Sequence, residues 1–196
     1  MYNNAAGCNT VEEVVEFCFF SCLPDGIEFN YQSEIDGFYN NFSGCVRMKG
    51  AVTLSGSDIS NLNGLSGLKS ISGNLVIEDN ELLTSLTGLD SVYFIGGNLK
   101  IGDQFFGNPN LTSLSGLDMV TFVGGYLKIE GNNALTNFTV FDMGTFVAGN
   151  LRIEGNDALT NFTGLESLSV LHGSLIVKDN DILTAFADLQ ELSTIG

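Results

Sequence analysis

The chain has 196 residues, 44% of them hydrophobic, which is enough for a substantial core in one domain or one repeat array. It carries 7 basic and 23 acidic residues, so its formal net charge is −16. This balance argues against nucleic acid and anionic membranes as partners, because both bind through Lys and Arg. No apolar run approaches the ~18 residues that cross a bilayer. We therefore expect no membrane insertion.

The first 49 residues differ from the rest and predict an N-terminal cap. Thr10–Phe20 has an amphipathic pattern, and Thr10 with Glu13 suits a capping box, so a short helix is expected there. A turn is expected at Leu23–Gly26, which reads Leu-Pro-Asp-Gly. Ser33–Phe42 predicts a second short helix, packed across the first coil of the repeat array.

All four cysteines lie in this cap: Cys8, Cys18, Cys22 and Cys45. A clustered even number at one end of a repeat array favours disulfides in an oxidising compartment. Zinc is the alternative, because Cys18 and Cys22 are four residues apart, but a paired CxxC is missing and the single histidine, His172, is distant in sequence. Three pairings are possible, and we favour Cys22–Cys45 with Cys8–Cys18.

From Gly50 onward the sequence repeats. Glycines recur at intervals of 23, 24, 28, 24 and 24 residues, at Gly50, Gly73, Gly97, Gly125, Gly149 and Gly173. Each opens a unit whose next residues alternate apolar and polar, as in Leu127-Lys-Ile129, which predicts a short strand with one face inward. Because one unit cannot bury its own apolar face, the units must stack.

These patterns predict a mainly β protein, a right-handed parallel β-solenoid of about six 24-residue coils over residues 50–196, with a disulfide-stapled helical cap over residues 1–49. An asparagine recurs in the same place of successive units, and a structural role at a bend is expected for Asn80, Asn108, Asn132, Asn156 and Asn180. The 28-residue unit has its four extra residues within Gly102–Gly107, which predicts a protruding loop.

Cys45-Val-Arg-Met-Lys-Gly50-Ala-Val-Thr-Leu resembles the entry to receptor L domains, and the later Gly-x-Leu-x-Ile and Leu-x-Gly-Leu units are similar to leucine-rich, L-domain-like arrays of secreted and surface proteins of Bacteroidetes. The resemblance covers about residues 27–196. It implies a right-handed β-helix with a helical cap and an extracellular or cell-surface location. It supplies no catalytic residues and no ligand, and no cysteine-rich region follows the array.

The outward strand positions are the first candidate binding surface. Lys100, Lys128 and Arg152 should stack on adjacent coils, with Asn98, Tyr126 and Asn150 on the same face. A polar, partly basic groove for a glycan or acidic group is one interpretation, in which Tyr126 stacks on the ligand. A solvated ladder, with Glu130 and Glu154 offsetting the cations, is the other. Phe105 and Phe106 in the long loop are further candidate ligand contacts.

Two further columns and a set of acidic turns have two interpretations each. Phe94, Phe122 and Phe146 either widen the core or form an exposed aromatic stripe. A threonine column resembles ice-binding faces but lies near a bend: Thr84, Thr112, Thr136, Thr160 and Thr184. Acidic turns at Glu78–Asn80, Asp157 and Asp179–Asp181 suit either calcium or solvent, although the units share no fixed ligand set.

We therefore expect no enzyme, no cofactor and no metal site, since no nucleophile or metal motif is present. The leading hypothesis is a secreted or cell-surface module that binds a glycan or surface protein through its strand face. The alternatives are a structural spacer in a larger adhesin or filament and, with less support, an ice-binding protein. The last unit stops at Gly196 without a recognisable cap, so we expect further repeats, or another chain, to stack on it.

Overall fold

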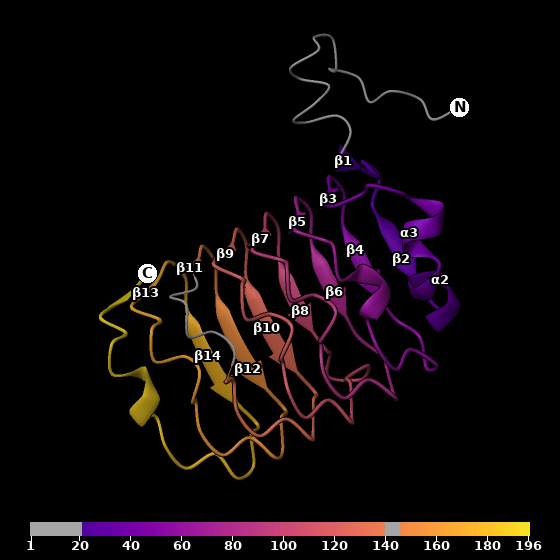
Figure 1. Ribbon diagram of the computed structural model, residues 1–196. Helices are drawn as coiled ribbons and strands as arrows, with labels where there is room; N and C mark the ends of the chain where they lie inside the picture. Colours follow the sequence, from indigo (N-terminus) through magenta and orange to yellow (C-terminus); the bar gives the residue numbers. More distant parts are fainter. Residues whose placement is uncertain (1–20, 140–145) are drawn as a thin grey trace, which may run out of the picture.

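The protein is a β-solenoid of about seven turns, built from two parallel sheets, in a computed structural model that describes residues 21–139 and 146–196 (Figure 1). The eight-stranded sheet contains β1 (Ser21–Cys22), β3 (Arg47–Met48), β5 (Ser70–Ile71), β7 (Phe94–Ile95), β9 (Phe122–Val123), β11 (Phe146–Val147), β13 (Val170–Leu171) and β15 (Thr194–Ile195). The seven-stranded sheet contains β2 (Ile27–Phe29), β4 (Val52–Leu54), β6 (Leu75–Ile77), β8 (Leu99–Ile101), β10 (Leu127–Glu130), β12 (Leu151–Glu154) and β14 (Leu175–Lys178).

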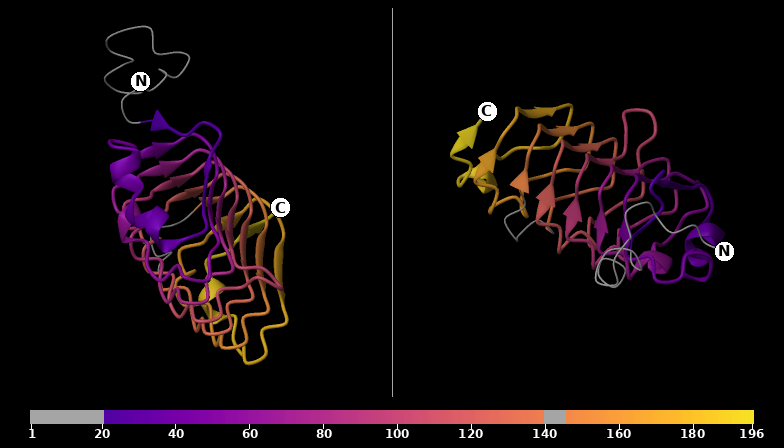
Figure 2. Two further views of the ribbon diagram at one scale, coloured as in Figure 1. Left: turned by 90° about the vertical axis from the view of Figure 1, so that its right-hand side faces the viewer. Right: turned by 90° about the horizontal axis from the view of Figure 1, so that it is seen from above.

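Each coil contributes one strand to each sheet, and the coils follow one another in sequence order along one axis (Figure 2). The pairing is in register, so that Leu127 of β10 lies beside Leu99 of β8 and Leu151 of β12. Equivalent residues therefore form continuous columns, and the inward ones form one core. The predicted alternation is confirmed in β6 and β8, where the outer two residues are buried and the middle one is partly exposed.

The asparagine column bonds coil to coil, as predicted, and all its members are buried except Asn180 in the last coil, which is partly buried. The Nδ2 of Asn80 donates to Oδ1 of Asn108 at 2.9 Å, and Nδ2 of Asn108 donates to Oδ1 of Asn132 at 3.0 Å. The same amides also satisfy main-chain groups, since Asn108 Nδ2 donates to the Ile77 carbonyl at 3.0 Å. A buried side-chain amide stays stable only when its donors and acceptors are paired, and the repeat provides both partners.

The sheets begin earlier than Gly50, and the count of about six coils is corrected to about seven turns. Strands β1, β2 and β3 lie within residues 1–49, which were predicted to be a helical cap. Ile27-Glu-Phe29 pairs with Val52-Thr-Leu54 as a regular neighbour, although its glycine, Gly26, lies one residue later than Gly50 and Gly73 do in the units that follow. The predicted turn at Leu23–Gly26 is present, with the Gly26 N–H donating to the Leu23 carbonyl at 3.0 Å.

The predicted helix at Ser33–Phe42 is two short helices, α2 (Gln32–Asp36) and α3 (Phe38–Asn41), which meet at Gly37. They place Ile35 and Phe38 on the first coils as fully buried side chains. The predicted helix at Thr10–Phe20 and the predicted pair Cys8–Cys18 lie outside the described residues. A Cys22–Cys45 disulfide is present, with Cα atoms 5.6 Å apart, and it ties β1 to the turn that precedes β3.

Two short 3-10 helices complete the described elements: η2 (Asn63–Leu65) packs against α2 and α3, and η3 (Ala187–Leu189) lies in the last coil. Apolar columns that are buried elsewhere reach solvent in this coil, where Phe186 is 57% exposed and Ile195 is 53% exposed. Among the described residues, no helix has the length and apolar character needed to span a membrane.

Candidate functional site

The predicted basic column is present on the outer face of the seven-stranded sheet. Lys128 of β10 lies beside Lys100 of β8 and Arg152 of β12 in the strand register. Val76 and Ile176 continue the column on either side. The three cations thus share one surface, and each side chain is partly exposed.

Every cation of this column is paired with a carboxylate. Lys100 Nζ lies 2.6 Å from Glu78 and 2.9 Å from Asp103, while Lys128 Nζ lies 3.4 Å from Asp103 and also contacts Glu130. Because an anionic ligand would have to displace these carboxylates, the column is a poor anion site.

Arg152 and Lys178 share the carboxylate of Glu154, one on each oxygen. The hydrogen bond to Glu154 raises the pKa of Lys178 above its ordinary value. Four of the seven basic residues of the chain are therefore engaged in this ladder of ion pairs.

The pKa values of the ladder reflect the same pairing. The hydrogen bond from Lys100 lowers the pKa of Asp103 from 3.8 to about 2, although partial burial opposes the shift. Partial burial also works against the charged form of Lys100, but the hydrogen bonds to Glu78 and Asp103 outweigh it, and the pKa of Lys100 is raised. Both groups stay ionised around neutral pH, and the ladder is a fixed row of charges.

The other predicted contacts on this face, Asn98, Tyr126 and Asn150, lie where the strands begin. Their main role in the structure is to connect coils. The Asn98 side-chain oxygen accepts from the Tyr126 N–H at 3.0 Å, and the Asn150 oxygen accepts from the Ser174 N–H at 2.9 Å. Tyr126 is exposed, but it lies at the opposite end of its strand from Glu130 and the turns beyond it.

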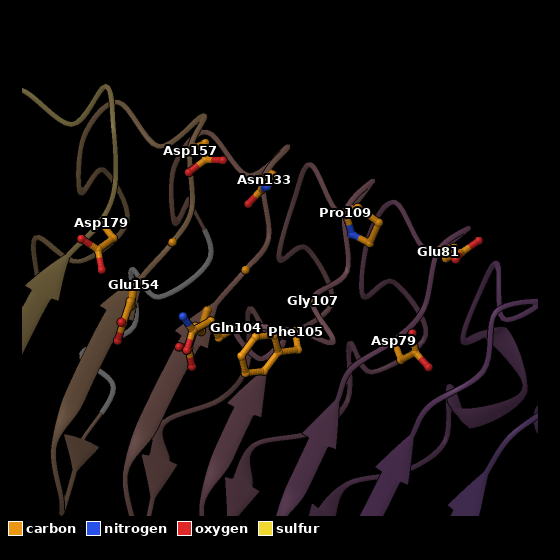
Figure 3. Close-up of a pocket in the computed structure, with 13 residues that line it drawn as sticks. Asp79, Glu81, Gln104, Phe105, Gly107, Pro109, Asn133, Glu154, Asp157 and Asp179 are labelled. Atoms are coloured by element: carbon orange, nitrogen blue, oxygen red, sulfur yellow. The ribbon is translucent and has the colours of Figure 1, made fainter.

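A groove of about 450 Å³ lies where the strands of this sheet end (Figure 3). Six carboxylates line it, together with the amides of Gln104 and Asn133: Asp79, Glu81, Glu130, Glu154, Asp157 and Asp179. Glu130 and Glu154 are only 2% and 3% exposed, and their strands hold them rigidly beside Lys128 and Arg152. The other four come from the turns after the strands.

The inserted loop covers part of this groove. Figure 3 shows Gln104 and Phe105 beyond the strand ends, between Asp79 on one side and Glu154 on the other. The Phe105 side chain is 80% exposed and belongs to the groove lining, whereas Phe106 is 56% exposed and does not. The Phe106 carbonyl instead accepts from the Asp79 N–H at 3.0 Å, which ties the loop to the previous coil.

The sequence identified the acidic turns as candidate ligands. It did not predict that they line one groove together with Phe105. Asp79, Asp157 and Asp179 were weighed as calcium ligands or solvated turns. In the ranges 21–139 and 146–196, no three Asp, Glu, His or Cys side chains are grouped closely enough to hold a metal ion. The signal that could have located the groove is the four-residue insertion, because it sits beside the ends of the strands.

The phenylalanine column faces outward from the eight-stranded sheet, so the interpretation that it widens the core is wrong. Phe94, Phe122 and Phe146 stack with centroids 5.0 and 5.4 Å apart and planes within 6° of parallel. Their strand neighbours Ile95, Val123 and Val147 point inward and are buried. The rings are partly exposed and form an aromatic ladder along the outer surface.

The threonine column lies between strands rather than on one. Its members are exposed, and two of their hydroxyls bond the coil before them: Thr112 Oγ1 donates to the Thr84 carbonyl at 3.2 Å, and Thr160 Oγ1 donates to the Thr136 carbonyl at 3.2 Å. These threonines thus connect successive coils in an irregular segment.

The fold and its surfaces define a repeat protein of the β-solenoid class with an acidic, aromatic-bordered groove. Comparisons with protein families, with curated proteins and with solved structures found no match.

Proposed function

We propose that the protein is a non-catalytic extracellular recognition module that binds a glycan, and that the ligand lies in the acidic groove beside Phe105. The observation that carries the proposal is the composition of the groove: six carboxylates, two side-chain amides and one highly exposed aromatic ring around about 450 Å³. Ligand sites of this size commonly combine an apolar surface with a few fixed polar groups.

The charge of the groove favours a neutral or cationic sugar over an acidic one. Within the described residues, no Lys or Arg lines it, and the nearby cations already contact carboxylates. Ionised carboxylates only accept hydrogen bonds, so they pair with hydroxyl or ammonium donors of a sugar. The Phe105 ring offers a flat apolar surface for the C–H face of a sugar ring. The basic column had led us to expect a glycan or an acidic group as the ligand. The groove favours a smaller class, the neutral or cationic sugars.

The ion pairs of the two buried carboxylates support the proposal of binding without hydrolysis. A glycosidase needs one carboxyl group that keeps its proton near neutral pH. Glu130 contacts Lys128, and Glu154 contacts both Arg152 and Lys178. Both buried carboxylates thus already serve as ion-pair partners of lysine and arginine side chains, which favours a binding role over proton donation.

The proposed location rests on the cap and on the resemblance to L-domain arrays. A disulfide between Cys22 and Cys45 persists in an oxidising compartment such as the cell exterior. Receptor L domains and the leucine-rich arrays that resemble this chain are surface or secreted modules, so a glycan of a neighbouring surface is an accessible partner.

The test is a binding screen of the full chain against immobilised neutral, amino and acidic oligosaccharides, followed by titration of the best ligand. Phe105→Ala should weaken its binding about tenfold, since stacking on an aromatic ring contributes on the order of 1 kcal/mol or more. Phe106→Ala is the matched control, because this ring shares the loop but not the groove, and it should change affinity less than twofold. Equal losses for both variants, or binding of the neutral or amino sugar that survives Phe105→Ala, would exclude the groove as the site.

A spacer within a larger assembly is the second candidate, and the last coil favours it. The edge strands β14 and β15 leave hydrogen-bonding groups free on one side, and Phe186 and Ile195 are more than half exposed. Such an edge pairs readily with another coil. A spacer predicts concentration-dependent association in light scattering that Ile195→Lys abolishes. A monomer at all concentrations, together with saturable glycan binding, would favour recognition alone.

A further inference from the structure

Three basic residues lie outside the ion-pair ladder, and they gather at one place on the opposite sheet. Within the described part of the chain, Arg47, Lys49 and Lys69 have no ion-pair partner. Arg47 belongs to β3, Lys49 follows this strand directly, and Lys69 directly precedes β5, the neighbouring strand. In a chain with a net charge of −16, a cluster of cations without an ion pair to any residue in 21–139 or 146–196 is a distinct local feature.

A notch lies beside this cluster where the aromatic ladder is interrupted. In the register of the eight-stranded sheet, Ser70 lies between Arg47 and Phe94. Its small side chain occupies the place that a ring occupies in the next three coils, which carry Phe94, Phe122 and Phe146. The resulting cavity measures about 360 Å³, and seven residues line it: Arg47, Met48, Lys49, Ser70, Ser72, Tyr93 and Phe94.

The dimensions of the notch suit one six-membered ring. Arg47 and Phe94 are two strands apart, which is about 10 Å at about 4.8 Å per strand. A ring at the level of Ser70 would therefore lie about one strand spacing from the Phe94 ring, close to the 5.0 Å that separates Phe94 from Phe122. A volume of about 360 Å³ is near the lower limit of ligand pockets, which matches a single sugar unit rather than a long segment.

We propose that this notch is a second binding site, specific for an acidic sugar unit, namely a hexuronate within an acidic glycan. The sugar ring stacks on Phe94, the carboxylate pairs with the Arg47 guanidinium, and Lys49 adds a second positive charge. A guanidinium presents a planar fork of donors that matches a carboxylate. Ser70, Ser72 and Tyr93 line the same cavity, and their hydroxyls are donors and acceptors that suit the hydroxyl groups of a sugar.

The net negative charge of the protein does not prevent this contact. At physiological salt, charges farther away than about 8 Å are largely screened. The ligand carboxylate therefore responds mainly to Arg47 and Lys49, which line the notch, and little to the carboxylates of the groove on the other sheet. The notch and the groove thus select opposite charges, and they do not share a residue.

The experiment is calorimetric titration of the full chain with trigalacturonate, with its methyl ester and with sodium acetate. We expect saturable binding of trigalacturonate, and affinity at least about tenfold lower for both the ester, which lacks the charge, and acetate, which lacks the ring. Arg47→Gln should weaken trigalacturonate binding at least about tenfold. Lys69→Gln is the charge-matched control outside the notch, and it should change affinity less than twofold.

Filling the notch gives an independent check. Ser70→Phe continues the aromatic ladder into the cavity and should abolish trigalacturonate binding while the variant keeps the circular dichroism spectrum of the parent chain. Val170→Phe extends the ladder at its other end, beyond Phe146, and should leave binding unchanged. Equal binding of the methyl ester, undiminished binding by folded Ser70→Phe, or equal effects of Arg47→Gln and Lys69→Gln would overturn the proposal. Phe105→Ala separates the two sites, because it should leave trigalacturonate binding unchanged whether or not the groove binds a neutral glycan.

Discussion

Removing one amide from the buried asparagine ladder should cost much more stability than its size suggests. The Asn132 oxygen accepts from the main-chain N–H and the Nδ2 of Asn108 at 3.3 and 3.0 Å. Its Nδ2 donates to the carbonyls of Ile101 and Glu130 at 2.9 and 3.1 Å, with a longer contact to Asn156 at 3.4 Å. Asn132→Ala therefore breaks four good hydrogen bonds at a fully buried position. At about 1 kcal/mol each, the expected loss in the free energy of unfolding is about 3–4 kcal/mol.

Guanidinium denaturation followed by circular dichroism measures this loss, and hydrogen exchange at the Asn108 amide locates it. Asn133→Ala is the neighbouring control, since Asn133 is exposed and should change the free energy of unfolding by about 0.5 kcal/mol or less. Because coils of a repeat protein contact only their neighbours, Asn132→Ala should also deprotect the adjacent coils first. A loss below about 1 kcal/mol, or an Asn108 amide as protected as in the parent chain, would refute the role assigned to the ladder.

The remaining predictions concern charge, the disulfide and the groove. Because the pKa of Asp103 is lowered from 3.8 to about 2, its pairing with Lys100 should be fully stabilising above about pH 4 and lost as the pH falls through about 2. Solvent screening limits this contribution to on the order of 1 kcal/mol, and Lys100→Met should remove it from a plot of melting temperature against pH. Reduction of Cys22–Cys45, which are separated by 23 residues, should lower the free energy of unfolding by about 3 kcal/mol in urea titrations with and without reductant. Asp179 adopts a φ of 53°, so Asp179→Gly should keep stability within about 1 kcal/mol while weakening neutral-glycan binding in the same titration as Phe105→Ala.

The parts of the fold that recur in the sequence could be predicted from it. The spacing of the glycines and the alternation around Leu127-Lys-Ile129 determine where strands lie and which side chains point inward. The first coil was missed because Asp25 stands where the later units have their opening glycine, and Ile27-Glu-Phe29 is a single short alternation. It becomes a strand through pairing with β4, which is a tertiary effect that no local pattern reports.

The candidate sites were harder to predict, for physical reasons that differ between them. The cations of the strand face were expected correctly, but their pairing depends on Asp103, which lies in the inserted loop and reaches both Lys100 and Lys128. Its position follows from the loop conformation and not from the repeat. The direction of Phe94 was ambiguous because its strand has two residues, both apolar, so that no alternation distinguishes the inside from the outside.

Both proposed sites lie where the repeat is interrupted, and the stacking of coils explains why. In a regular column each side chain finds its partner one coil away, as Phe122 does between Phe94 and Phe146 and as Asn132 does between Asn108 and Asn156. Such groups have little capacity left for a ligand. An insertion at residues 102–107 moves Phe105 out of its coil. The small side chain of Ser70, between Arg47 and Phe94, leaves one face of the Phe94 ring without a stacked ring. On a surface where repetition pairs most groups with one another, binding capacity is concentrated at positions that depart from the repeat.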